Sequence, residues 1–152
     1  MIMVLHYLSL GFAAGFARKN IFTKEFMEAN FGEEHRKATG SEIQAGGLPD
    51  HGSGRYTMKA GYKAWMEFNT AQRAHYNYLE NFTQVVAMML MAGIHWPVPT
   101  AILGGTYTLG RIIYSVGYKL CGPKGRVPGA LILLLMQFCF PIYTIVSLSY
   151  LW

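Results

Sequence analysis

Arg73, Asn77 and Glu80 are spaced so that three side chains able to bind a polar ligand share one face of a helix. They belong to a segment that continues directly into the apolar run from Phe82 to Ile94. A guanidinium at the centre of a membrane helix costs about 2.5–3.5 kcal/mol on insertion scales. A membrane segment that keeps Arg and Glu at this cost is expected to use them on a polar ligand or on a partner helix.

The composition of the chain indicates a membrane protein. Of its 152 residues, 52% are hydrophobic and 14% are charged, whereas soluble domains carry about 25% charged residues. The net charge of +5 would suit a nucleic-acid partner. The charges gather in loops between apolar segments, however, which argues against nucleic acid. Cys121 and Cys139 have no metal-type or redox-type spacing, and the scattered histidines show no metal-ligand pattern, so no metal site is expected.

Four apolar segments predict an all-α, four-helix transmembrane bundle in a single domain. The first segment is short enough to resemble the apolar part of a signal peptide, but a basic pair follows it directly, so we favour a retained helix. The first half of the long polar segment is compatible with an amphipathic surface helix, and the rest is expected to be a loop. The helices are expected at about residues 1–18, 64–94, 100–120 and 128–151, and the polar segment at about 20–63.

The distribution of basic residues predicts the orientation in the membrane. Eight Lys and Arg residues lie between Arg18 and Lys63, and Lys119, Lys124 and Arg126 lie near the connection between the third and fourth helices. The connection between the second and third helices has none. The positive-inside rule therefore places both basic loops in the cytoplasm or an equivalent compartment, with both termini on the opposite side. Membranes of the endoplasmic reticulum and of mitochondria both remain open.

Arg111 lies at about the same depth in the third helix as Glu80 in the second, so these two residues are expected to pair. Tyr114 and Tyr118 follow Arg111 on the same helix face. One interpretation is a buried network that fixes the register of the helices, and another is a ligand site. The excess of arginine over carboxylate favours an anionic ligand. The arginines concerned are Arg18, Arg73, Arg111 and Arg126.

These residues resemble the MAPEG family, the integral membrane proteins of eicosanoid and glutathione metabolism. The resemblance covers most of residues 65–152 and is greatest for the branch of microsomal glutathione S-transferase 3. It is carried by Phe68-Asn69, Gln72-Arg73-Ala74-His75, Asn77, Leu79-Glu80, Gly110-Arg111, Tyr114, Gly117-Tyr118 and Arg126.

The resemblance implies a homotrimer with glutathione, the co-substrate, bound between subunits and open to the cytosolic side. Arg126 matches the arginine that holds the glutathione thiolate and is the expected catalytic residue. Arg18 and His75 are expected to approach the site from the neighbouring subunit. A thiol near a fixed positive charge has a lowered pKa, and the thiolate is the nucleophile. The residues expected to bind glutathione are Arg18, Arg73, His75, Asn77, Glu80, Arg111, Tyr114 and Tyr118.

Two functions are compatible with these features. The first is a glutathione transferase or peroxidase that acts on lipophilic electrophiles or lipid hydroperoxides arriving through membrane lipids. The second is a non-catalytic relative that serves as a structural subunit of a larger membrane complex. Three departures from the family pattern favour the second function. Asn81 replaces an aromatic or apolar residue, Thr83 replaces a proline, and the polar segment 20–63 is unusually long. A scaffold that presents lipid to a partner enzyme is a third interpretation.

Overall fold

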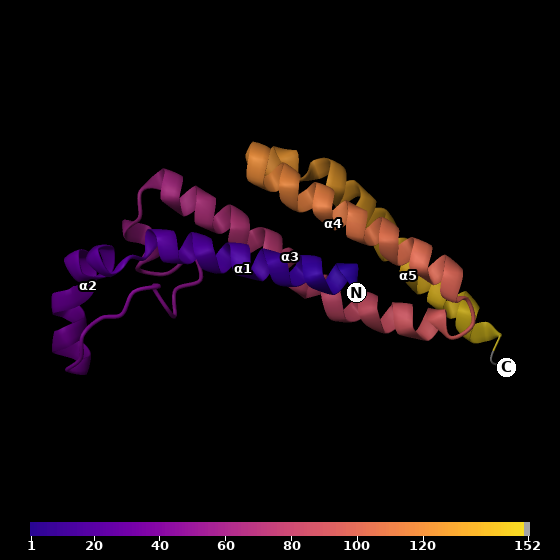
Figure 1. Ribbon diagram of the computed structural model, residues 1–152, viewed down its shortest axis with the longest axis horizontal. Coiled ribbons are helices and arrows are strands. Elements are labelled where there is room, and N and C mark those ends of the chain that lie inside the picture. The colour runs from indigo at the N-terminus through magenta and orange to yellow at the C-terminus, as the bar shows by residue number, and fades with distance from the viewer. Residues whose placement is uncertain (151–152) are drawn as a thin grey trace. The chain divides into compact units, whose positions relative to one another are not determined.

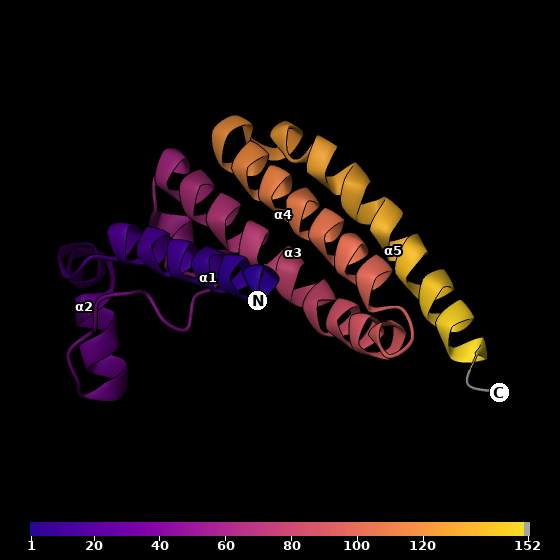
Figure 2. The same cartoon turned by 45° about the vertical axis from the view of Figure 1, so that its right-hand side comes forward.

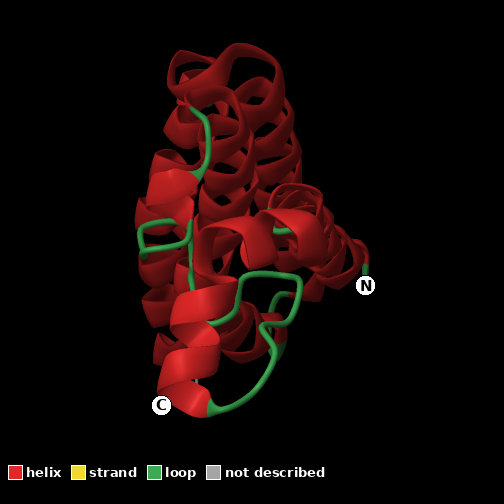
Figure 3. Cartoon of the chain, turned by 90° about the vertical axis from the view of Figure 1, so that its left-hand side faces the viewer, coloured by secondary structure: helices red, strands yellow, loops and turns green. Residues whose placement is uncertain are grey.

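The computed structural model describes residues 1–150, and within this range every regular element is a helix, which confirms the all-α class (Figure 3). The expected end of the last helix, at about residue 151, lies outside the described residues. The elements in chain order are α1 (Ile2–Ile21), α2 (Lys24–Thr39), the short 3-10 helix η1 (Thr57–Lys59), α3 (Tyr62–Gly93), α4 (Pro97–Gly125) and α5 (Val127–Ser149) (Figure 1).

The chain divides into two compact units. The single membrane domain expected from the sequence stays a prediction. The first unit combines Met1–Ser9 with the residues from Ala74 onward, and the second comprises Leu10–Arg73. Each of the long helices α1 and α3 contributes residues to both units. The two units are therefore described one at a time.

In the first unit, α4 and α5 lie side by side along their length (Figure 2). Glycines allow the two backbones to touch. A Cβ atom added to Gly129 would lie 2.3 Å from the backbone nitrogen of Tyr114 and 2.7 Å from the carbonyl oxygen of Gly110. A Cβ on Gly117 would lie 2.1 Å from the carbonyl oxygen of Gly125. Small residues at such positions are what membrane helices use to approach closely.

The connection between α4 and α5 differs from the sequence-based expectation. The connection expected between 120 and 128 is more helical than predicted, because α4 extends past the break at Gly122 to Gly125 and α5 begins at Val127. A single kink at Gly122, with φ 63° and ψ −153°, interrupts the helical path. Glycine adopts this conformation without steric cost. Pro128 stands in the first turn of α5, where a missing N–H costs nothing.

Within residues 1–150, α5 is the one helix that is both long enough and apolar enough to cross a membrane, judged by length and composition alone. Its mean hydropathy is 2.2. Helices α3 and α4 carry charged residues along their lengths, including Glu80 and Arg111, which lowers their apolar character. The remaining three spans therefore stay predictions at this point.

The second unit has a hydrophobic core of its own. Five buried residues form its centre, and four half-buried apolar residues pack against them. Helix α2 begins at the N-cap Thr23, whose Oγ1 accepts a hydrogen bond from the backbone N–H of Phe26 at 3.2 Å. It ends at Gly40, which has the left-handed conformation typical of helix C-termini. The core residues are Phe22, Met27, Phe31, Ile43 and Phe68, flanked by Ala17, Ile21, Phe26 and Tyr56.

The segment between α2 and α3, expected to be a plain loop, is organised around one buried carboxylate. Asp50 accepts hydrogen bonds from the backbone N–H groups of Gly52, Gly54 and Thr57 at 2.8, 2.9 and 2.7 Å. The Thr57 hydroxyl donates a fourth, at 2.7 Å. Burial alone would raise the pKa of Asp50, but the hydrogen bonds from Thr57 and the two glycines outweigh it and hold the pKa below its ordinary value.

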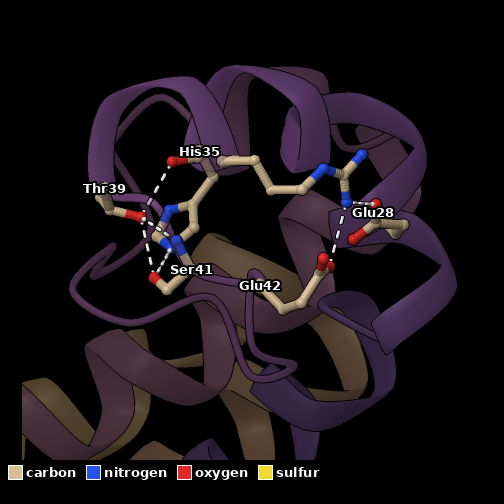
Figure 4. A network of polar contacts seen from close by, with 6 residues as sticks. Glu28, His35, Thr39, Ser41 and Glu42 are labelled. Carbon is tan, nitrogen blue, oxygen red and sulfur yellow. Dashed lines mark hydrogen bonds and ion pairs between the residues drawn. The ribbon is translucent and has the colours of Figure 1, made fainter.

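Several charged side chains of α2 form ion pairs, within the helix and with the segment that follows it (Figure 4). Arg36 pairs with Glu28 and, at 3.0 Å, with Glu42. Close by, Thr39 Oγ1 lies 2.8 Å from the Ser41 hydroxyl. These side chains are exposed, and exposed ion pairs contribute about 0–1 kcal/mol each. The arrangement agrees with a solvated, mixed-charge surface.

Candidate functional site

The first unit contains a buried arginine whose partners are all uncharged. Arg111, only 2% exposed, donates from Nε and Nη2 to the hydroxyl oxygen of Tyr107 at 2.9 and 2.7 Å. Its Nη1 donates to the side-chain oxygen of Asn77 at 2.6 Å. The guanidinium carbon also lies 4.7 Å from the ring centre of Tyr78 and 5.0 Å from that of Tyr107. Ring faces attract cations, but none of these contacts cancels the charge.

The expected ion pair between Arg111 and Glu80 is wrong. Glu80 is exposed on α3, and the ion pairs found among the described residues all lie between Glu28 and Arg55. Asn77, three residues before Glu80, contacts Arg111 instead. Three residues rotate a helix by about 300°, so Glu80 points about 60° away from Asn77 although the two belong to one broad face, and equal depth alone does not select the side chain that meets α4. Asn77 is directed toward α4, whereas Glu80 lies on the exposed face.

A second arginine lies against two tyrosines of α4. Arg126 donates from Nη1 to the hydroxyl oxygen of Tyr114 at 3.0 Å. Its guanidinium carbon lies 5.8 Å from the ring centre of Tyr114 and 5.5 Å from that of Tyr118. The hydrogen bond with Tyr114 raises the pKa of Arg126 further, so this residue is a permanent cation.

The structure places seven of the nine expected site residues in the first unit, and five of these form two contacting groups, Asn77 with Arg111 and Arg126 with Tyr114 and Tyr118. Arg111, Tyr114 and Tyr118 share a face of α4 by their spacing, Asn77 contacts Arg111 from α3, and Arg126 follows α4. Two guanidinium groups thus occur in this unit, each with uncharged hydrogen-bond acceptors only. Such an arrangement can bind an anion.

The amino-terminal turns of α1 pack on the same unit. His75, half-buried, contacts Tyr7 with ring centres 5.0 Å apart. The hydroxyl of Tyr78 donates to the carbonyl oxygen of Met3 at 3.1 Å. His75 thus has an intramolecular aromatic partner, and its expected contact with glutathione stays a prediction.

The other two expected arginines belong to the second unit. Arg18 donates from Nη1 to the carbonyl oxygen of Gly46 at 3.4 Å, and its Nη2 lies 3.4 Å from Nδ1 of His51. Its guanidinium lies 5.3 Å from the ring centre of Phe68. Arg73 is exposed on α3. The roles of both arginines in ligand binding stay predictions.

The residues that hold Arg111 in place are not among those expected from the sequence, except for Asn77. Tyr107 precedes Arg111 by one helical turn, a spacing that would have identified it. The sequence identifies Asn81 as a departure from the family pattern but does not predict its hydrogen-bond partner. In the structure its Oδ1 accepts a hydrogen bond from Nε2 of Gln137, the one amide side chain in the otherwise apolar α5. A single amide side chain in a mostly apolar helix indicates a polar partner on a neighbouring helix, and this pattern could have been read from the sequence.

A profile of the MAPEG family matches residues 1–146. The chain therefore belongs to the MAPEG family, which confirms the resemblance at the level of the family. This family includes glutathione transferases and related proteins, and its members commonly use glutathione. Membership also implies a helical membrane bundle. No solved structure matches the chain.

Proposed function

We propose that this protein is a membrane-bound glutathione transferase or peroxidase, most similar to the microsomal glutathione S-transferase 3 branch. Its substrates would be lipophilic electrophiles or lipid hydroperoxides. The observation that carries the proposal is the pair of arginines in the first unit, Arg111 and Arg126, whose hydrogen-bond partners are all uncharged.

The energetics of a buried charge support an anionic ligand. Taking an ion out of water costs several kcal/mol in real proteins, and neutral partners recover only part of that cost. Arg111 is almost fully buried, and none of its hydrogen-bond partners carries a negative charge. Glutathione carries two carboxylates, and the planar guanidinium matches carboxylate geometry. Its bound thiolate would add a third negative group.

The chemistry we propose depends on Arg126. Its positive charge favours the glutathione thiolate over the thiol, and the thiol proton leaves to water. In the transferase reaction, the thiolate sulfur forms a bond to the electrophilic carbon of the substrate. Either a leaving group departs with the electron pair of its bond, or the double bond of a conjugate acceptor opens and its other carbon takes a proton from water. In the peroxidase reaction, the sulfur attacks the hydroperoxide and breaks the O–O bond, which gives the lipid alcohol and a sulfenic acid. A second glutathione then reduces the sulfenic acid, with release of water and glutathione disulfide.

Part of the site would come from a second subunit. Glu80 is exposed although it lies on a helix of a membrane bundle, where a partner surface must cover a carboxylate. We propose a homotrimer in which Arg18 and His75 of one subunit meet Asn77, Glu80 and the other site residues of the next. The four-span topology and residence in the endoplasmic reticulum or the mitochondria are parts of the same proposal.

Glutathione titration of the detergent-solubilised protein, followed by ultraviolet absorbance of the thiolate, tests this function. We expect saturable binding and a thiolate signal near neutral pH. Arg126→Ala should lose the thiolate signal, and Arg55→Ala, at an exposed arginine paired with Glu34, should keep it. A wild-type protein that neither binds glutathione nor forms thiolate would refute the proposal.

A second function, that of a structural subunit in a larger membrane complex, is favoured by the second unit. This unit has its own core and an ordered segment around Asp50, which gives it a defined extramembrane surface. The native mass of the gently solubilised protein separates the two functions. A lone trimer supports the enzyme, and quantitative co-migration with many other chains supports the subunit.

A further inference from the structure

A series of hydrogen bonds crosses three helices of the first unit. Gln137 on α5 donates from Nε2 to Oδ1 of Asn81 on α3. Asn81 donates from Nδ2 to the backbone carbonyl oxygen of Asn77, one turn earlier, at 2.8 Å. The side-chain oxygen of Asn77 accepts from Nη1 of Arg111 on α4 at 2.6 Å. Polar side chains thus lead step by step from α5 to the buried guanidinium.

The surroundings make these bonds costly to lose. Helix α5 is apolar around Gln137, with Leu133, Met136 and Phe140 buried and Leu134 exposed. In hydrocarbon no water replaces a broken hydrogen bond, so an amide there keeps its protein partner. Asn81 uses its acceptor on Gln137 and its donor on Asn77, which fixes the orientation of its side chain.

The two ends of the series set the position of α3 between its neighbours. Asn77 and Asn81 lie one turn apart, and the first contacts α4 while the second contacts α5. Among the described residues, Asn77 supplies the one hydrogen-bond acceptor on another helix to which Arg111 donates. A shift of this turn of α3 would withdraw that acceptor and leave Tyr107, on the same helix as Arg111, as the remaining hydrogen-bond partner.

We propose that Gln137 and Asn81 are positioning residues that hold Asn77, and through it the guanidinium of Arg111, in the geometry that receives an anion. The hydrogen-bond geometry alone carries the positioning role, and its consequence for glutathione rests on the proposed function. Asn81, a departure from the family pattern, thus has Gln137 as its hydrogen-bond partner and a positioning role in this chain.

Two variants remove the same hydrogen bond from opposite sides. Gln137→Met keeps the length of the side chain and removes the amide. Asn81→Leu keeps the volume and removes both the acceptor for Gln137 and the donor to Asn77. Ser147→Ala is the matched control, because Ser147 also donates from α5 to α3, at 3.1 Å to the carbonyl oxygen of Ala92, but is not connected to Asn77. The double variant of Gln137 and Asn81 tests whether the two residues act as one unit.

Two measurements on the protein distinguish a loss of the position of Arg111 from a general weakening of the packing between helices. The first is hydrogen exchange at Nη1 of Arg111, the atom that donates to Asn77, in protein labelled with ¹⁵N-arginine, with Arg111→Lys used to assign the signal. We expect Gln137→Met and Asn81→Leu each to speed this exchange about tenfold, and Ser147→Ala to leave it unchanged. The second is the Kd for glutathione, which should rise about five- to tenfold in both variants and no further in the double variant.

Each result decides one claim. Unchanged exchange at Arg111 in Gln137→Met and Asn81→Leu would overturn the positioning role, as would an equal change in Ser147→Ala. If exchange quickens as expected but the wild-type protein does not bind glutathione, the proposed function fails and the positioning role stands. If exchange at Arg111 becomes faster and the Kd for glutathione is unaltered, Arg111 does not contribute to glutathione binding.

Discussion

Arg126 and Tyr114 are joined by a hydrogen bond of 3.0 Å from the guanidinium Nη1 to the phenol oxygen. The contact closes across the kink at Gly122, because Arg126 follows the end of α4 whereas Tyr114 is buried in its middle. The position of this cation therefore depends on a hydroxyl group, and the hydroxyl can be removed while the charge stays.

Arg126→Ala is expected to abolish turnover while leaving trimer formation intact. Without this cation the pKa of the bound glutathione thiol rises, by about 1 unit or more, since an opposite charge at such distances stabilises the ionised form. Tyr114→Phe, which frees Arg126 but keeps its charge, should raise the same pKa by less. The pH dependence of thiolate absorbance measures both shifts. Because the thiol pKa rises, the loss of thiolate absorbance is largest at acidic pH, and the thiolate signal returns at pH values above the raised pKa.

The outcome that would remove Arg126 from the mechanism is undiminished turnover of Arg126→Ala at neutral pH. Arg55→Ala serves as the charge-matched control, since it removes an exposed arginine of the second unit. A loss of turnover in this control would indicate an effect of net charge rather than of position.

Gly129→Ala is expected to destabilise the protein by about 1–3 kcal/mol or more, because its new methyl group would meet the backbone of α4 and force the helices apart. The nearest atom, the backbone nitrogen of Tyr114, would lie at 2.3 Å. Gly105→Ala on α4 is the matched control, because a Cβ at Gly105 meets nothing within 4 Å. That control should be neutral or stabilising by up to about 1 kcal/mol, the usual gain of alanine over glycine in a helix. Thermal unfolding in detergent compares the two, and equal stability would contradict the close backbone contact.

Periodicity predicts which residues of one helix act together but not which helices they meet. Tyr114 and Tyr118 were placed on the face of Arg111 by spacing alone, and this spacing depends only on the α-helix. The partner of Arg111 was predicted from depth along two helices, and depth leaves the direction of each side chain undetermined. Packing of α3 against α4 decided between Asn77 and Glu80, and such packing is not readable from one sequence.

The boundaries of the helices show a similar limit. The all-α class followed from long apolar segments, which determine helices in a membrane because each backbone group must be satisfied within its own segment. The glycine and proline at 122–123 were interpreted as a loop, since these residues often end helices. Here they produce a kink. The order around Asp50 also escaped prediction, because its four hydrogen bonds require a turn that only the folded segment forms.

Asp50→Asn is expected to loosen the segment between α2 and α3. The variant loses one carboxylate oxygen that accepts from Thr57 and gains an NH₂ group with no acceptor in its place, at a cost of about 1–3 kcal/mol. Limited proteolysis between residues 40 and 61 should cut the variant faster than wild type. Glu67→Gln, at an exposed carboxylate of α3, is the control and should be cut at the wild-type rate.

The pH dependence of this protection has a definite sign. The pKa of Asp50 is lower in the folded protein than its ordinary value of 3.8. Its contribution to stability is therefore complete above that value and is lost as the pH falls through the lower, folded pKa. Protection of wild type should stay level from about pH 5 to about pH 8 and fall only in stronger acid. A loss of protection already at about pH 6 would assign the effect to another group.

Labelling of single cysteines tests the orientation of the helices. Cys121 is exposed next to the basic connection between α4 and α5, so with Cys139→Ser it reports on that end of the bundle. In sealed vesicles of known orientation, an impermeant maleimide should reach Cys121 from the cytosolic side, because basic loops stay on that side. Ser53→Cys, in the long polar segment, should react from the same side, and Val98→Cys, at the connection between α3 and α4, from the opposite one. Reaction of the cysteines at 53 and 121 from opposite sides would mean an odd number of spans between them, which contradicts a bundle in which α3 and α4 both cross the membrane.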